Sequence, residues 1–163
     1  MKCQEDASNI ETVATTIIKE AGYNKNKIEY DAIAWTIYNR MQSPTGCGFS
    51  SNPKDNVLLK NQYEVNKKFY GAECMPKSEV YLKNGVEDMF KVTSFQADLT
   101  YARQLATNLE MGLKPTPTDP TGNLVFFLAN SKAVRDANPD GFAIGGNWFF
   151  DTKGSIGCGR IKG

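Results

Sequence analysis

Residues 8–23, S-N-I-E-T-V-A-T-T-I-I-K-E-A-G-Y, open the patterned part of the chain. The stretch begins with the S-x-x-E pattern of a helix capping box, and its apolar residues then recur at the spacing of one helical face. Gly22 stands where a residue in the left-handed conformation commonly ends a helix. We therefore predict a helix from about residue 9 to residue 21, with Glu20 at the edge of its apolar stripe.

Four later segments also have the pattern of regular elements. Residues 29–42 carry apolar side chains in nearly every direction around a helix, which predicts a central helix. Residues 93–112 open with a second capping box and keep one face apolar, which predicts a third long helix. Residues 124–128 and 147–150 are short apolar runs next to turn residues, as expected of strands. The predicted fold class is α+β, mainly helical, with a small β element.

The segments between these elements are rich in turn-forming residues. Residues 44–62 and 114–123 are expected to be loops, and Gly145-Gly146 a bulge or tight turn. The length of 163 residues suits one domain, so we expect a single domain over residues 1–163.

Composition excludes several classes of function. The chain has no histidine, so it lacks the residue that Ser-His-Asp hydrolases, Cys-His hydrolases and His-ligated zinc enzymes require. Nineteen basic residues are balanced by 18 acidic ones without charge blocks, so we expect no nucleic-acid partner. No apolar run is long enough to predict a membrane span. Acid/base chemistry by carboxylates is compatible with this composition, with no cofactor and no metal ion.

The four cysteines indicate two disulfides in an oxidising compartment. They are even in number and widely spaced, without a C-x-x-C pair. We expect Cys3 to pair with Cys158, which would join the termini, and Cys47 with Cys74, which would pin the central loop sequence. The alternative is four buried free thiols in a cytosolic protein.

Glu20 is the candidate general acid. It lies in the last turn of the predicted helix, beside apolar side chains, where helix dipole and desolvation both disfavour the ionised carboxylate. A carboxyl group that stays protonated can donate a proton to a glycosidic oxygen. The alternative is an ordinary solvated surface glutamate.

Four stretches of the sequence resemble the SleB-like cell-wall hydrolases, which act on bacterial peptidoglycan and spore cortex. Residues 13–23 are similar to the family's helix ending in Glu-Ala, and residues 32–43 to its next helix ending in Asn-Arg. Residues 119–130 and 144–150 resemble its D-P-T-G and I-G-N segments, in the same order. The sequence departs from the family where Lys19 replaces a glycine and where Leu128 and Trp148 replace histidines.

The resemblance implies a lysozyme-like fold and a single peptidoglycan-glycosidase domain that cleaves the β-1,4 bond between N-acetylmuramic acid and N-acetylglucosamine. Carried over by position, it implies that Glu20 is the catalytic acid and that the sugar groove is lined by Asn39, Gln62, Tyr63 and Asn147.

Two chemical routes are open. A hydrolase needs a second carboxylate, for which Glu64 and Asp98 are candidates, whereas a lytic transglycosylase needs only one. The implied partner is the peptidoglycan glycan strand, in an extracytoplasmic location. A secreted antibacterial toxin, with a cognate immunity protein as a further partner, is one role among others such as remodelling or phage lysis. The alternatives from other classes are a non-catalytic cell-wall-binding module and a disulfide-stabilised interaction protein.

Overall fold

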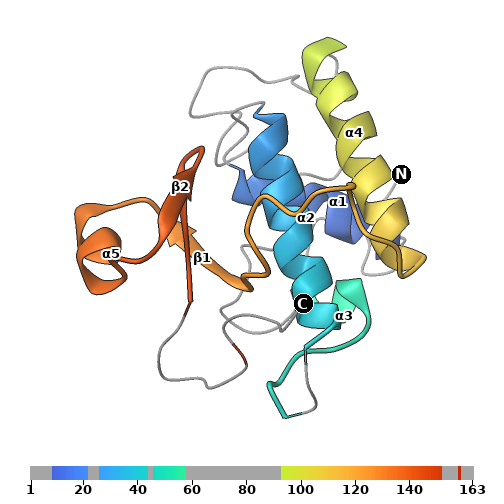
Figure 1. The fold of residues 1–163 in the computed structure, drawn as a ribbon. Coiled ribbons are helices and arrows are strands. Elements are labelled where there is room, and N and C mark those ends of the chain that lie inside the picture. Colours follow the sequence, from blue (N-terminus) through green and yellow to red (C-terminus); the bar gives the residue numbers. More distant parts are fainter. Residues whose placement is uncertain (1–8, 22–25, 44–45, 58–92, 152–157, 159–163) are drawn as a thin grey trace.

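Helices make up most of the described part of the chain, and a small antiparallel sheet lies beside them (Figure 1). The computed structural model describes residues 9–21, 26–43, 46–57, 93–151 and 158. The elements in chain order are α1 (Asn9–Glu20), α2 (Lys27–Met41), α3 (Pro53–Val57), α4 (Thr93–Glu110), β1 (Phe126–Ala129), α5 (Lys132–Ala137), β2 (Phe142–Ile144) and β3 (Asn147–Phe150). This mixture of helices with a small sheet agrees with the expected α+β class.

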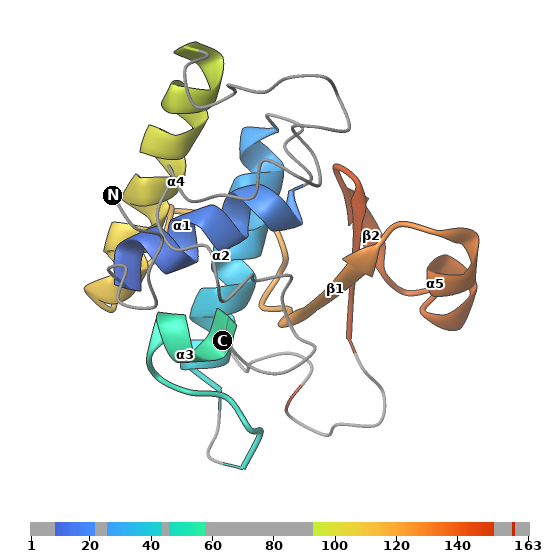
Figure 2. The same cartoon turned by 180° about the vertical axis from the view of Figure 1, so that it is seen from behind.

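The helix α2 runs through the middle of the molecule. Figures 1 and 2 show α4 on one side of it, the sheet on the other, and α1 crossing it. The backbone starts this helix two residues earlier than the sequence pattern predicted, because the Asn26 side chain accepts hydrogen bonds from the amides of Ile28 and Glu29.

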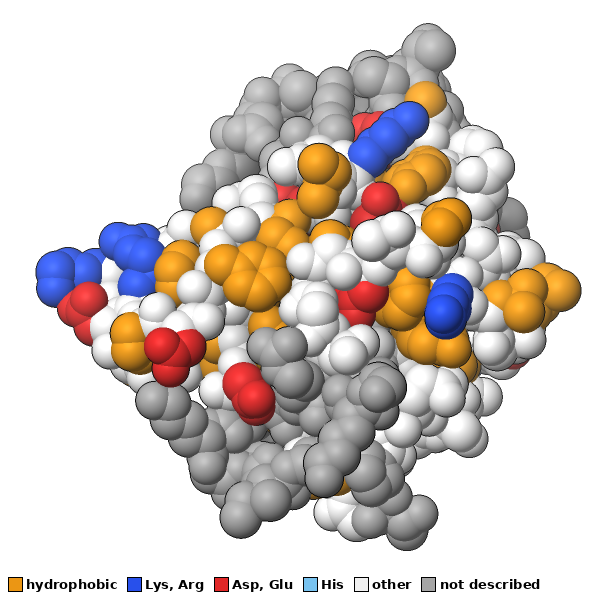
Figure 3. All heavy atoms as spheres, viewed as in Figure 1, with side chains coloured by type: hydrophobic (Ala, Val, Ile, Leu, Met, Phe, Trp, Pro, Cys, Tyr) orange, Lys and Arg blue, Asp and Glu red, His pale blue; other side chains and the backbone are white. Residues whose placement is uncertain are grey.

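The three strands form a sheet in the order β1-β3-β2, and both pairings are antiparallel. The register aligns Phe127, Phe149 and Phe142 across the sheet on one face. That face is turned toward α2, because Phe149 packs with Ala32 and Leu124. Figure 3 shows hydrophobic side chains across the middle of this side of the molecule, and Lys and Arg side chains at the end formed by α5.

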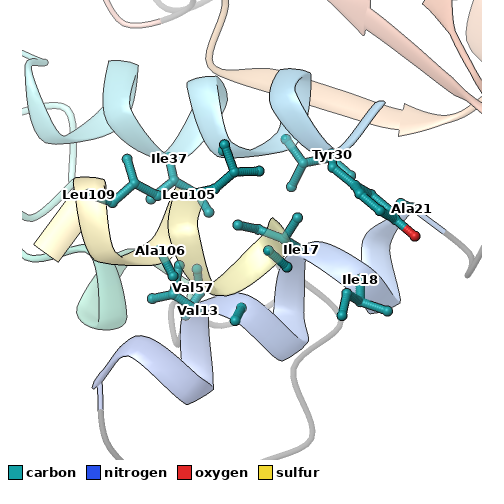
Figure 4. Close-up of a cluster of buried hydrophobic side chains, with 14 of the residues drawn as sticks. Val13, Ile17, Ile18, Ala21, Tyr30, Ile37, Val57, Leu105, Ala106 and Leu109 are labelled. Atoms are coloured by element: carbon teal, nitrogen blue, oxygen red, sulfur yellow. The ribbon is translucent and has the colours of Figure 1, made fainter. Parts of the chain in front are cut away.

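The main core is built where α1, α2 and α4 pack together (Figure 4). Ile17 of α1, Ile33 and Ile37 of α2 and Leu105 of α4 are almost fully buried. Each such aliphatic side chain contributes roughly 1.5–3 kcal/mol relative to an exposed one. The continuous burial of Ala32 to Ile37 confirms the expectation that residues 29–42 contain a central helix.

Three short elements were not predicted. The helix α3 lies inside the segment expected to be a loop, and α5 and β2 lie between the two strands that the sequence indicated. The expected strand at 124–128 is found at Phe126–Ala129, while the strand at Asn147–Phe150 has the predicted bounds. Among the described residues, no helix is both long and apolar enough to cross a membrane.

The disulfide pairing expected from the sequence was wrong. Cys47 is bonded to Cys158, with the two Cα atoms 5.5 Å apart. The segment after α2 folds back toward β1, where the Arg40 guanidinium lies over the rings of Phe49 and Phe126. The disulfide joins this segment to Cys158. Cys3 and Cys74 lie outside the described residues.

Candidate active site

The end of α1 and the first turn of α2 meet the β2–β3 turn at Asn147. The Asn147 Nδ2 atom donates to the backbone carbonyl of Glu20 at 3.1 Å and to the Glu29 Oε1 atom at 2.7 Å. The Gly146 amide donates to the same Glu29 oxygen at 3.1 Å. Glu20 and Asn147, which are 127 residues apart in the sequence, are therefore in direct contact, and both were candidates from the sequence.

Glu20 is the last residue of α1 and is partly buried. It follows Ile17 and Ile18, which are completely enclosed by the core. The last carbonyls of a helix have no partner within the helix, so the bond from Asn147 satisfies one of them. The end of α1 is thereby tied to the sheet. Gly22, the expected end of this helix, lies outside the described residues.

Glu29 was not identified from the sequence. Only 1% of this residue is exposed, although it carries a carboxylate. It stands three residues after the N-cap Asn26, where the helix dipole stabilises negative charge, and it accepts hydrogen bonds from Asn147 and Gly146. Two signals could have revealed it: the capping-box spacing from Asn26, and Ile33 four residues later on the same buried side.

The β2–β3 turn is shaped to fit around the Glu29 carboxylate. Gly145 has a φ of +59°, and a Cβ atom built on it would lie 2.0 Å from the Glu29 Oε2 atom. A side chain at this position would therefore clash with the carboxylate and would also strain the backbone. The expectation of a tight turn at Gly145-Gly146 is confirmed, and its close contact is with a glutamate of α2.

Asn39 lies in the interior, and its contacts indicate a structural role. It is fully buried, and its Nδ2 atom donates to the Asp119 Oδ2 atom at 3.0 Å and to the Leu124 carbonyl at 2.9 Å. Asp119 in turn accepts from the amide and the hydroxyl of Thr121. The D-P-T-G segment is thus fastened to α2 through Asn39, which contributes no surface to a groove.

Within the described ranges, no contact places the other candidate site residues next to Asn147. Gln62, Tyr63 and Glu64 lie outside the described residues, and Asp98 is a partly buried residue of α4. The indole of Trp35 donates to Thr116 and that of Trp148 to the Asn138 carbonyl, so both side chains are fixed by packing and a hydrogen bond. In the described ranges, no three potential metal-ligating side chains form a cluster.

Comparison of the chain with protein-family models, with curated proteins and with solved structures found no match.

Proposed function

We propose that this protein is an extracytoplasmic, lysozyme-like peptidoglycan glycosidase in which Glu20 protonates the glycosidic oxygen. The observation that carries the proposal is the hydrogen bond from the Asn147 side chain to the backbone carbonyl of Glu20. The likeness to SleB-like hydrolases implies that these two residues share one site, and they meet in the structure although the sequence separates them widely. The disulfide between Cys47 and Cys158 supports an oxidising compartment.

The position of Glu20 suits a proton donor. It ends a helix, where the dipole disfavours negative charge, and it borders a buried apolar core. Donation of its proton to the oxygen between N-acetylmuramic acid and N-acetylglucosamine lets that bond break. The absence of histidine leaves carboxylates as the proton carriers of the chain near neutral pH.

The surroundings of Asn147 favour the lytic transglycosylase route. The carboxylate that meets Asn147 in the described residues is Glu29, which is buried and already accepts two hydrogen bonds. Activation of a water molecule would require a carboxylate with access to solvent. In the alternative route, the muramic acid 6-hydroxyl attacks the anomeric carbon, and its proton passes to the Glu20 carboxylate that the first step has left ionised.

Substitution of Glu20 by Gln tests the proposal. The change removes the acid and keeps the shape of the side chain, so we expect it to abolish release of muropeptides from purified sacculi, with little change in thermal unfolding. Glu110→Gln is the matched control, because Glu110 is the exposed last residue of α4 and should tolerate the change. Full activity of Glu20→Gln would falsify the assignment.

Mass spectrometry of the products separates the two routes. Anhydro-muropeptides are expected from a lytic transglycosylase, whereas reducing ends would mean that a second carboxylate activates water. Binding to sacculi without any release of fragments by the wild-type protein would contradict the enzyme proposal and would point to a wall-binding module.

A further inference from the structure

We propose that Glu29 is a positioning residue that fixes the side-chain amide of Asn147 and, through it, the end of α1 at Glu20. This inference rests on the proposed function, because positioning has a catalytic meaning only if Glu20 reacts. Glu29 touches Asn147 and the β2–β3 turn, so it acts through them, and we assign it no direct step in the reaction.

The hydrogen bonds determine the orientation of the Asn147 amide. Both of its neighbours, the Glu20 carbonyl and the Glu29 carboxylate, are acceptors, so the Nδ2 group and not Oδ1 must face them. Each of the two amide hydrogens then has one partner. Any contact of Asn147 with a sugar must be made through Oδ1, as an acceptor from a hydroxyl or N–H group of the substrate.

The two bonds differ in strength. The bond to Glu29 joins a buried carboxylate at 2.7 Å, whereas the bond to Glu20 joins a neutral carbonyl at 3.1 Å. Hydrogen bonds to charged acceptors are roughly twice as strong as neutral ones. Glu29 is therefore the anchor of the Asn147 side chain, and the last turn of α1 is held through that anchor.

The turn contributes to the same arrangement from the other side. The Gly146 amide donates to the oxygen that Asn147 uses, and the backbone of Gly145 passes close to the other carboxylate oxygen. The carboxylate, the turn and Asn147 thus fit one another closely. Loss of the carboxylate leaves Asn147 without its stronger acceptor in a site where only 6% of this asparagine is exposed.

The first test reads the Asn147 amide directly and requires no activity. In wild-type protein labelled with nitrogen-15, the Asn147 Nδ2 protons are assigned by their loss in Asn147→Ala. We expect their exchange with solvent to become about tenfold faster in Glu29→Ala, in line with the loss of one hydrogen bond to a charged group. Glu29→Gln keeps an oxygen acceptor and is expected to restore slow exchange. Unchanged exchange in a folded Glu29→Ala would overturn the proposal.

The second test is kinetic. Because misplacement of a reacting group by about 1 Å can cost about 100-fold in rate, we expect kcat for muropeptide release to fall by that order in Glu29→Ala, with little change in KM. Glu29→Gln should recover most of kcat. Asp31→Ala is the matched control, because Asp31 is also on α2 but bonds to Tyr101 of α4. Its kcat should stay near the wild-type value at temperatures where all variants are folded.

The two proposals fail in different ways. If wild-type protein releases no muropeptides, the proposed function fails, while faster exchange of the Asn147 amide in Glu29→Ala still supports the positioning by Glu29. If wild-type protein is active and Glu29→Ala has the same kcat, Glu29 is a structural residue only and the positioning proposal is wrong.

Discussion

The carboxyl group of Asp31 on α2 is a titratable group whose surroundings change the free energy of unfolding with pH. Burial raises the pKa of Asp31 above its ordinary value of 3.8, although the hydrogen bond from Tyr101 and the charge of Lys27 act in the opposite direction. A raised pKa means that the folded protein binds the proton more tightly than the unfolded chain. The stability that this group contributes is therefore present below pH 3.8 and is lost as the pH rises through the pKa of the folded state.

Asp31→Asn should remove this dependence. Asparagine is neutral at every pH, and its side-chain oxygen can still accept the hydrogen bond from Tyr101. The free energy of unfolding of Asp31→Asn, relative to that of wild type, should therefore rise between pH 3.8 and neutrality, because only the wild-type protein loses stability there. Urea unfolding of both proteins across this range measures the difference. The same substitution at the exposed Asp55 is the control. A difference between Asp31→Asn and wild type that falls with increasing pH would contradict the sign of the shift.

Single residues also show which parts of the site the sequence could predict. The sequence identified Glu20 as a candidate because this residue ends a strongly patterned helix. Its place in one site with Asn147 was implied by the resemblance to the SleB-like hydrolases. Glu29 was missed: its spacing from Asn26 and Ile33 indicates a glutamate in the first turn on the buried side of a helix, but no local pattern indicates that a turn 117 residues later encloses its carboxylate. The resemblance assigned Asn39 to the groove, but the three-dimensional contacts enclose it.

Asn39 contributes to the packing of α2 against the segment after α4. Its amide bonds to Asp119 and to the Leu124 carbonyl hold this segment against the second half of the helix. Asn39→Ala removes the side-chain donor of the Leu124 carbonyl and one of the donors to Asp119, so we expect a loss of about 1–3 kcal/mol in the free energy of unfolding. Denaturant unfolding measures this loss. Muropeptide release per folded molecule should persist, whereas a higher KM with unchanged stability would mean that Asn39 binds sugar.

Elements were predictable from the sequence where their own residues carry the pattern. The long helices α1 and α4 were located by their apolar periodicity and capping-box residues, and the strand β3 by a short apolar run next to turn residues. The short elements α3, α5 and β2 lack such a pattern: α5 has no buried residue, and β2 is only three residues long. They exist because neighbouring strands pair and because side chains such as Ser131 cap their ends.

The disulfide between Cys47 and Cys158 joins parts of the molecule that are distant in the chain, with a sequence separation of 111 residues. Sequence could not select this pairing, because it depends on how the segment after α2 folds against the sheet. A crosslink that closes so long a loop restricts the unfolded chain strongly, by about 4–5 kcal/mol in the chain-entropy description.

Removal of this bond should therefore destabilise the fold without altering the hydrogen bonds that Asn147 donates to Glu20 and Glu29. We expect the double variant Cys47→Ser, Cys158→Ser to lose about 2–5 kcal/mol in urea unfolding under oxidising conditions. The single variant Cys47→Ser is the control and should lose a similar amount, because either change breaks the same bond. Peptide mapping of the non-reduced wild-type protein provides the direct check: a crosslinked peptide containing Cys47 and Cys158 is expected. A peptide that joins Cys3 to Cys158 would contradict this pairing and would mean that the segment after α2 is held by noncovalent contacts such as those of Arg40 with Phe49 and Phe126.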